Sequence, residues 1–212
     1  MFCCLPLLNA VSAPRLLKAA QVRGRHVLLR NAEAGDAAFI WQLRHHPARN
    51  RYMSPTSSEL DDQRAWLAAY ARDETQAYFV ITQADSGEAL GTVRLYDARG
   101  DSFCWGSWML LPGVPATTAM ESALIVYRYA WTLGFRRAHF EVHRDNAPVR
   151  RFHERFGAQV VGEREDQVQY GLAADALRTA LDRYTRWLPE GIHIVPHPFA
   201  GPAPADAGPP SG

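Results

Sequence analysis

The stretch "AHFEVHRDNAPVRRFHERFGA", residues 138–158, decides how the rest of the chain is interpreted. Its first six residues alternate apolar with titratable side chains, which predicts a half-buried strand. Because successive side chains of a strand point to opposite faces, His139, Glu141 and His143 share one face. A short basic amphipathic segment follows and ends in Phe-Gly, which predicts a helix. The stretch therefore predicts a strand–helix unit that presents three ionisable groups to one side.

The sequence on either side predicts a regular succession of strands and helices. Trp66, Leu67 and Tyr70 are expected on the buried side of a helix at 59–72. Before the opening stretch, the predicted elements are a strand at 25–30, a helix from Asp36 that ends before Pro47, the helix at 59–72, strands at 77–83, 89–98 and 102–111, a loop at 112–118 and a helix at 119–134. The predicted elements from there on are a strand at 137–143, a helix at 147–156, a hairpin at 158–172 and a helix at 173–188.

This order predicts an α/β fold with one mixed, mostly antiparallel sheet. Three consecutive antiparallel strands precede a strand–helix–strand unit, so helices are expected on both faces of the sheet. Residues 25–188 are expected to form the domain. Residues 1–24 are interpreted as a weakly ordered extension, and residues 189–212, rich in Pro, Gly and Ala, as a disordered tail.

The composition is that of a globular protein and excludes several functional classes. Hydrophobic residues make up 47% and charged residues 21% of 212 residues, and 23 basic against 22 acidic residues leave a formal net charge of +1. This balance argues against a dedicated nucleic-acid binder, and no apolar run is long enough to cross a membrane. The three cysteines fit neither a disulfide framework nor a zinc site, so a cytoplasmic protein without a metal is expected.

Three segments of the chain resemble the GNAT superfamily of acetyl-CoA-dependent N-acetyltransferases. Residues 140–158 resemble the family's fifth strand, the Asn that follows it and its fourth helix. "WGSWML", residues 105–110, resembles its fourth strand, and "ESALIVYRYAWTLGF", residues 121–135, its third helix. The resemblance covers roughly residues 27–172. It implies a three-layer αβα fold, acetyl-CoA as co-substrate and a primary amine as acceptor, in a monomer or a homodimer.

The resemblance places the CoA pyrophosphate at residues 114–119, "VPATTA", where the family has Gln/Arg-x-x-Gly-x-Gly/Ala. Val114 replaces the basic or amide residue, and Thr117 replaces the central Gly. A pyrophosphate needs N–H groups at the positive end of a helix, which residues other than Gly also supply. A turn before a core helix is the structural alternative. The expected pyrophosphate-binding residues are Gly113, Ala116, Thr117, Thr118 and Ala119.

The pantetheine arm is expected beside the main chain of residues 110–119, next to Glu141 and His153. By the family's geometry, main-chain groups of Leu110 and Leu111 would bind the arm and the oxyanion. Asn146 occupies the position of an Asn that the family uses for the same arm. A helix N-cap is the structural alternative for Asn146, and both roles are compatible.

Acetyl transfer needs a base for the amine proton and an acid for the leaving thiolate. Glu141 stands where ribosomal-protein acetyltransferases carry their base, and a partly desolvated carboxylate there would be a better proton acceptor near neutral pH. His153 stands where those enzymes carry an acidic Tyr, and an imidazole can donate or accept a proton near neutrality. A structural hydrogen bond between Glu141 and His153 is the alternative.

The acceptor class is inferred from two further segments. Residues 51–70 and 151–158 resemble enzymes that acetylate amino sugars on nucleotide carriers and, less closely, ribosomal-protein N-terminal acetyltransferases. An amino sugar on a nucleotide is therefore the favoured acceptor, and a protein N-terminus is the alternative. A module that binds acyl-CoA without turnover is a third possibility, because the pyrophosphate loop is altered and His153 replaces Tyr.

Four residues are candidates for contacting the acceptor. Arg49, Tyr52 and Met53 lie on the loop that walls the acceptor side in the family, where Arg49 would pair with a phosphate. Trp105 would stack on a base or a sugar. A solvated arginine and core aromatic residues are the structural alternatives for these positions.

Overall fold

The computed structural model describes residues 13–47, 52 and 56–198. The predicted extension before residue 13 and the predicted tail after residue 198 lie outside these residues. The helices are α1 (Ala37–His45), α2 (Leu60–Arg72), α3 (Ala116–Thr132), α4 (Ala147–Arg155) and α5 (Ala174–Arg183), with single 3-10 turns at Ala34–Asp36 and Thr185–Trp187. In the described residues, no helix is both long and apolar enough to span a bilayer.

One mixed sheet runs through the molecule in the order β7-β8-β6-β5-β4-β3-β2-β1-β9. Among the strand pairs of the described residues only β5 and β6 run parallel, so the predicted mixed, mostly antiparallel sheet is confirmed. The strands are β1 (Ala19–Arg23), β2 (Val27–Asn31), β3 (Ala77–Gln83), β4 (Ala89–Arg99), β5 (Ser102–Leu110), β6 (Arg137–His143), β7 (Gln159–Arg164), β8 (Gln167–Leu172) and β9 (His193–Pro196).

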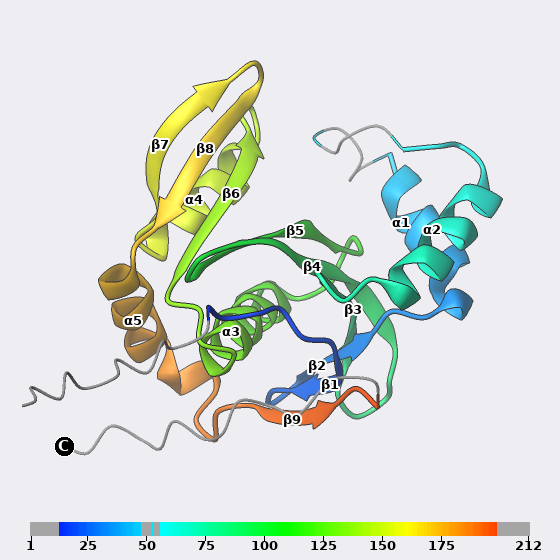
Figure 1. Cartoon of the computed structure of the whole chain (residues 1–212), viewed down its shortest axis with the longest axis horizontal. Coiled ribbons are helices and arrows are strands. Elements are labelled where there is room, and N and C mark those ends of the chain that lie inside the picture. The colour runs from blue at the N-terminus through cyan, green and yellow to red at the C-terminus, as the bar shows by residue number, and fades with distance from the viewer. Residues whose placement is uncertain (1–12, 48–51, 53–55, 199–212) are drawn as a thin grey trace, which may run out of the picture.

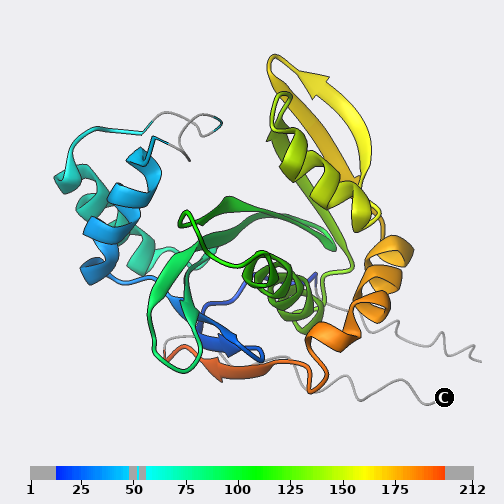
Figure 2. The same cartoon turned by 180° about the vertical axis from the view of Figure 1, so that it is seen from behind.

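Helices cover both faces of this sheet, as the alternation of its strands requires (Figures 1 and 2). On one face, which we call the α3 face, Phe79, Phe103 and Phe140 join the larger core with α3 and α5. On the other, the α2 face, Tyr78 and Val80 form a smaller core with α1 and α2. The three-layer αβα arrangement is therefore confirmed. Helices α1 and α2 cover only one half of their face and leave the half over β5, β6 and β8 uncovered (Figure 1).

The predicted buried side of α2 is correct at two positions and wrong at one. Leu67 and Tyr70 are each 2% exposed, whereas Trp66 is 36% exposed. Trp66 instead stacks on the Tyr70 ring at 5.8 Å and faces the uncovered half of the sheet.

The predicted domain boundaries are wrong at both ends, because β1 and β9 belong to the sheet. Strand β1 pairs with β2 on one side and with β9 on the other. Val22 is fully buried, and Lys18 Nζ donates to the carbonyl of Tyr70, 2.6 Å away, at the end of α2. Neither strand has a strong local signal, and each is stabilised by pairing with residues distant in sequence.

Strands β5 and β6 stay paired only at their first residues. Their register runs from Ser102 opposite Arg137 to Cys104 opposite His139, whereas β5 continues to Leu110. Beyond Cys104 the two strands diverge, and the sheet opens between them. This opening positions the site described next.

Candidate active site

A cavity of about 1220 Å³ lies at the opening between β5 and β6 and extends over the uncovered half of the α2 face. This is larger than the ~300–1,000 Å³ typical of a site for one small ligand. Trp108, Asn146 and His153 line it from the α3 side, and Arg94, Tyr96 and Glu141 line it from the α2 side. The cavity therefore connects the two faces of the sheet through the opening.

The alternation along β6 decides which side chains enter which part of the cavity. Phe140 and Val142 are buried on the α3 face, whereas His139, Glu141 and His143 are more exposed on the α2 face. The predicted common face of the three ionisable residues is thus confirmed. They lie in the half of the α2 face that no helix covers.

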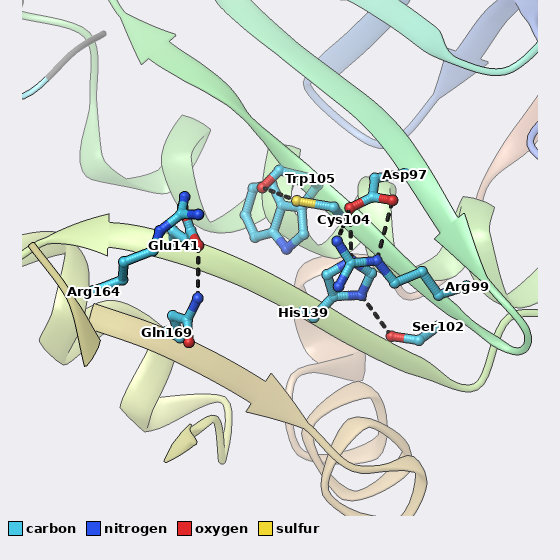
Figure 3. Close-up of polar contacts among 9 residues, drawn as sticks. All are labelled: Asp97, Arg99, Ser102, Cys104, Trp105, His139, Glu141, Arg164 and Gln169. Atoms are coloured by element: carbon cyan, nitrogen blue, oxygen red, sulfur yellow. Dashed lines mark hydrogen bonds and ion pairs between the residues drawn. The ribbon is translucent and has the colours of Figure 1, made fainter. Parts of the chain in front are cut away.

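Glu141 lies in the open groove of the α2 face (Figure 3). Gln169 Nε2 donates to its Oε1 at 2.9 Å, and Arg164 Nη2 lies 3.7 Å from its Oε2. Its side chain is 40% exposed, so the partial desolvation expected from the sequence is not found. The carboxylate is instead held in place by two neighbours and open to a ligand in the groove.

A second polar cluster lies in the same groove, at His139, the last residue of β6 that pairs with β5. The His139 Nδ1 is 2.8 Å from Ser102 Oγ, and its Nε2 is 3.4 Å from Asp97 Oδ2 (Figure 3). Hydrogen bonds from Arg99 and then from His139 lower the pKa of Asp97. The sequence reasoning missed Asp97 and Ser102, which reach His139 only because β4, β5 and β6 are adjacent. In the described ranges, no group of three or more His, Cys, Asp or Glu side chains is placed to hold a metal ion.

His153 lies on the opposite face from Glu141, packed among aromatic rings. Its ring centroid is 4.1 Å from that of Phe140 and 5.2 Å from that of Trp105, and its Nδ1 is buried without a hydrogen-bond partner in the described residues. Burial lowers the pKa of His153 from 6.5 to about 3. The prediction that His153 is the general acid assumed a pKa near neutrality. The buried environment contradicts that assumption. The alternative of a direct hydrogen bond to Glu141 is also wrong, because the sheet separates the two side chains.

The buried neutral imidazole has a consequence for stability in acid. Between pH 6.5 and about 3 the unfolded chain binds a proton that folded His153 does not, so stability falls as the pH falls through this window. We expect this residue to account for a loss of about 2 kcal/mol between pH 7 and pH 5. His153→Phe should shrink the difference in unfolding free energy between the two pH values by that amount, measured by urea denaturation.

The exposed His193, on β9, provides the matched control for this measurement. His193→Asn should leave the difference between pH 7 and pH 5 as it is in the wild type. An unchanged difference in His153→Phe would show that the imidazole is not held neutral by the fold.

The start of α3 is where the CoA pyrophosphate was expected. The helix begins at Ala116, within the predicted loop 112–118, so its positive end lies earlier in the chain than the sequence indicated. Gly113 has φ +83°, a left-handed conformation that favours glycine. Gly113, Ala116 and Thr117 are exposed, which suits contact with a phosphate.

Two of the five predicted pyrophosphate residues are less accessible. Thr118 is 6% exposed, and its N–H already donates to the carbonyl of Pro115 at 2.9 Å. The prediction that Thr118 supplies a free N–H is therefore wrong. Ala119 is partly buried in the first turn of α3.

The free edge of β5 has the groups that a pantetheine arm needs, although not from both predicted residues. The Leu111 N–H donates to the carbonyl of Leu90 at 2.8 Å, so it faces β4 and is not available to a ligand. Because main-chain groups alternate along a strand, those of Leu110 face the opening. Leu110 therefore fits the prediction and Leu111 does not.

A β-bulge sits midway along the same strand. Ser107 has φ +46°, and Thr92 Oγ1 donates to its carbonyl at 2.8 Å. Bulges re-aim main-chain groups next to functional sites, and this one turns β5 at the mouth of the opening. The sequence carries no signal for it.

Asn146 lies at the cavity wall, between β6 and α4. It occupies the N-cap position of α4, but its side chain makes no capping hydrogen bond. The N-cap alternative thus fails on its side chain, and the residue lines the cavity. This position suits the predicted contact with a pantetheine arm.

The predicted acceptor-side residues have mixed outcomes. Trp105 is 3% exposed, and its indole N–H donates to Tyr127 Oη at 3.2 Å, so the prediction that it stacks on a ligand is wrong and the core alternative holds. Tyr52 lines the cavity with its ring 5.0 Å from that of His143. Arg49 and Met53 lie outside the described residues.

The sequence reasoning also missed cavity residues on β4 and α1. Arg94 and Tyr96 alternate with the buried Val93 and Leu95, a period of two that could have placed them on one face. Arg44, in the last turn of α1, enters the same cavity.

Known proteins share both the sequence pattern and the fold. A family model described as "Acetyltransferase (GNAT) domain" matches residues 26–159, more than half of the chain. The solved structure described as "Apo FdhC- a nucleotide-linked sugar GNAT" is 36% identical, with a TM-score of 0.69, over 81% of this chain and 97% of that chain. No curated protein matches the chain significantly.

Two less similar structures share the fold alone. A probable GNAT acetyltransferase from Chromobacterium violaceum is 21% identical over 84% of this chain and 98% of that chain, with a TM-score of 0.69. A GCN5-related N-acetyltransferase from Brucella melitensis is 19% identical over 85% of this chain and 91% of that chain, also with a TM-score of 0.69.

Proposed function

The chain belongs to the GNAT acetyltransferase family, and on that premise we propose that it transfers the acetyl group of acetyl-CoA to the amine of an amino sugar carried on a nucleotide. It is an N-acetyltransferase, and enzymes of this family act on small-molecule or protein amines. The observation that carries the choice of acceptor is the 36% identity, along 97% of its length, to a nucleotide-linked sugar GNAT.

The donor enters from the α3 side of the opening. The N–H groups of Ala116 and Thr117 and the positive end of α3 receive the pyrophosphate. The arm then follows the free edge of β5, where the main chain of Leu110, at the end of that strand, and Asn146, in the cavity wall, bind it. This route brings the thioester into the opening beyond Cys104, where β5 and β6 part.

The acceptor amine meets the thioester from the α2 side. There Glu141 accepts a proton from the amine as the nitrogen attacks the carbonyl carbon. Main-chain N–H groups on the free edge of β5 stabilise the oxyanion of the tetrahedral intermediate. The C–S bond then breaks, and the CoA thiolate takes a proton from solvent or from Glu141. Base and donor act from opposite sides of the opening, so Glu141 and His153 need no contact.

His153 serves this reaction as a neutral group. Its ring lines the cavity on the side by which the thioester enters. With a pKa of about 3 the ring is neutral at neutral pH and lacks the acidic imidazolium proton, so we assign it the positioning of the arm by packing and by its remaining N–H. It is not the general acid.

A panel of amines tests the proposal. The purified chain is incubated with acetyl-CoA and amino sugars linked to uridine or thymidine diphosphate, the corresponding free amino sugars, and peptides with free N-termini. We expect thiol release with a nucleotide-linked amino sugar at a kcat/KM at least about tenfold above that of any peptide. Release with peptides alone would assign the chain to protein N-termini. Binding of acetyl-CoA without release for any amine would favour the non-catalytic module.

A further inference from the structure

Two arginines in the groove of the α2 face lack the carboxylate partners that the other cations there have. Arg99 pairs with Asp97, and Arg164 lies beside Glu141. No carboxylate in the described residues forms an ion pair with Arg44 or Arg94. The undescribed residues 48–51 and 53–55, which follow Arg44 in the sequence, contain no Asp or Glu.

Both guanidinium groups are held in a partly buried setting. The Nε atoms of Arg44 and Arg94 are buried and have no hydrogen-bond partner among the described residues. Arg94 lies between two aromatic rings, 5.3 Å from the centre of the Trp66 ring and 4.6 Å from that of Tyr96. The fold thus fixes Arg94 by stacking and leaves its Nε without a hydrogen-bond partner among the described residues.

The two positive charges are also near each other. Burial lowers the pKa of Arg44. The phenol of Tyr78, on β3, opposes this effect, and the positive charge of Arg94 lowers the pKa further. Two desolvated cations cost free energy unless an anion compensates them. A bound anion with several oxygens would relieve both the desolvation and the repulsion.

The arginines lie across the opening from the proposed base. Arg94 on β4 is opposite Gly106 on β5. Gly106 lies two residues beyond Cys104 and Glu141 two residues beyond His139, so Arg94, Gly106 and Glu141 form a row across three strands. Because β5 and β6 diverge beyond Cys104, Arg94 and Glu141 lie farther apart than the ~10 Å of two interstrand spacings. A sugar with its attached phosphate spans such a gap.

The row lies on the face opposite to the donor. The α3 N-terminus that receives the CoA pyrophosphate is on the α3 face, whereas Arg44 and Arg94 face the α2 side. The arginines are therefore placed for a second anion, one that belongs to the acceptor.

We propose that Arg44 and Arg94 form the site for the diphosphate of the nucleotide carrier, with the sugar lying between these arginines and Glu141 and its amine at Glu141. This rests on the proposed function. Arginine forks bind phosphate oxygens in pairs, which a single lysine cannot do. The site selects acceptors by charge and leaves the chemistry of the amine to Glu141.

Binding of a nucleoside diphosphate, measured without turnover, tests the site. Isothermal titration calorimetry follows uridine diphosphate and thymidine diphosphate binding to the full chain saturated with CoA, so that the donor site is occupied. We expect the double variant Arg44→Gln/Arg94→Gln to bind the better of the two about 100-fold or more weakly, with about ten- to a hundredfold from each arginine. Its affinity for CoA should not change.

Matched variants separate a specific site from a general field. Arg99→Gln removes one positive charge from the same groove, but this arginine already has Asp97 as a partner, so nucleoside diphosphate affinity should fall less than threefold. Arg94→Lys keeps the charge and loses the fork, and should lie between the wild type and Arg94→Gln. If the double variant does not fold, Arg94→Lys against Arg99→Gln decides the question.

Two results would overturn the inference. One is a wild-type chain, saturated with CoA, that binds neither nucleoside diphosphate. The other is a folded double variant with wild-type affinity. Both are independent of acetyl transfer. If the amine panel fails while the diphosphate binds through both arginines, the proposed acceptor is wrong and the anion site stands. If the panel succeeds and these variants bind nucleoside diphosphate normally, the proposed acceptor stands and the anion site is wrong.

Discussion

Replacing Glu141 by Gln should lower kcat about 100- to 10,000-fold, because the amide cannot accept the proton that the attacking amine must lose. The amide oxygen can still receive the hydrogen bond that Gln169 now donates at 2.9 Å, so the strand should keep its geometry. In the proposed function acetyl-CoA binds on the other side of the opening, and its dissociation constant should therefore be unchanged. Steady-state kinetics with the best amine of the panel, together with calorimetry of CoA binding, measure both quantities.

Glu163→Gln is the matched control for this prediction. Glu163 is an exposed carboxylate on β7 whose partner is Arg144 at 3.0 Å. Its replacement should change kcat less than twofold. A Glu141→Gln enzyme that retains more than a third of wild-type kcat would remove Glu141 from the mechanism, and His139 with Asp97 would become the base to test next.

Gly91→Ala should be the most damaging small substitution in the sheet. A Cβ at this position would lie 2.0 Å from the carbonyl oxygen of Met109, a backbone atom of β5 that cannot move aside without breaking the β4–β5 pairing. We expect a loss of about 3 kcal/mol or more in unfolding free energy, as for severe overpacking. Since Leu110 is directly opposite Gly91, acetyl-CoA affinity should fall as well. Urea denaturation and calorimetry test the two effects.

Gly35→Ala provides the comparison for Gly91→Ala. A Cβ at Gly35 would meet nothing within 4 Å, so this substitution should change the unfolding free energy by less than about 1 kcal/mol. Equal stability of the two variants would mean that β4 and β5 are not packed as closely as described.

The fold was predictable where local pattern and tertiary contact agree. Strand β6 spans the predicted residues 137–143 because its alternation matches burial against the α3 face. The same pattern placed Glu141 on the face that it shares with His139 and His143. At the ends of the domain the pattern is weak, and β1 and β9 form because each completes hydrogen bonds with a distant strand.

The site was predictable in position but not in environment. Sequence identifies His153 as a titratable residue at a suitable spacing, but its low pKa comes from rings on other elements, such as Phe140 and Trp105. Trp105 shows the same limit, since an aromatic residue on a strand contacts the core or a ligand according to its face. Arg44 and Arg94 meet only after α1 folds onto β4, so no local pattern joins them.

The alternation of side chains along β4, β5 and β6 has a practical consequence for protein engineering. Core positions such as Val93 and Phe103 point to one side, and groove positions such as Arg94 and Tyr96 point to the other. A library that randomises only the latter should yield enzymes with altered selectivity that still accumulate as folded protein. The scaffold thereby separates the evolution of new substrate preferences from the maintenance of its own structure.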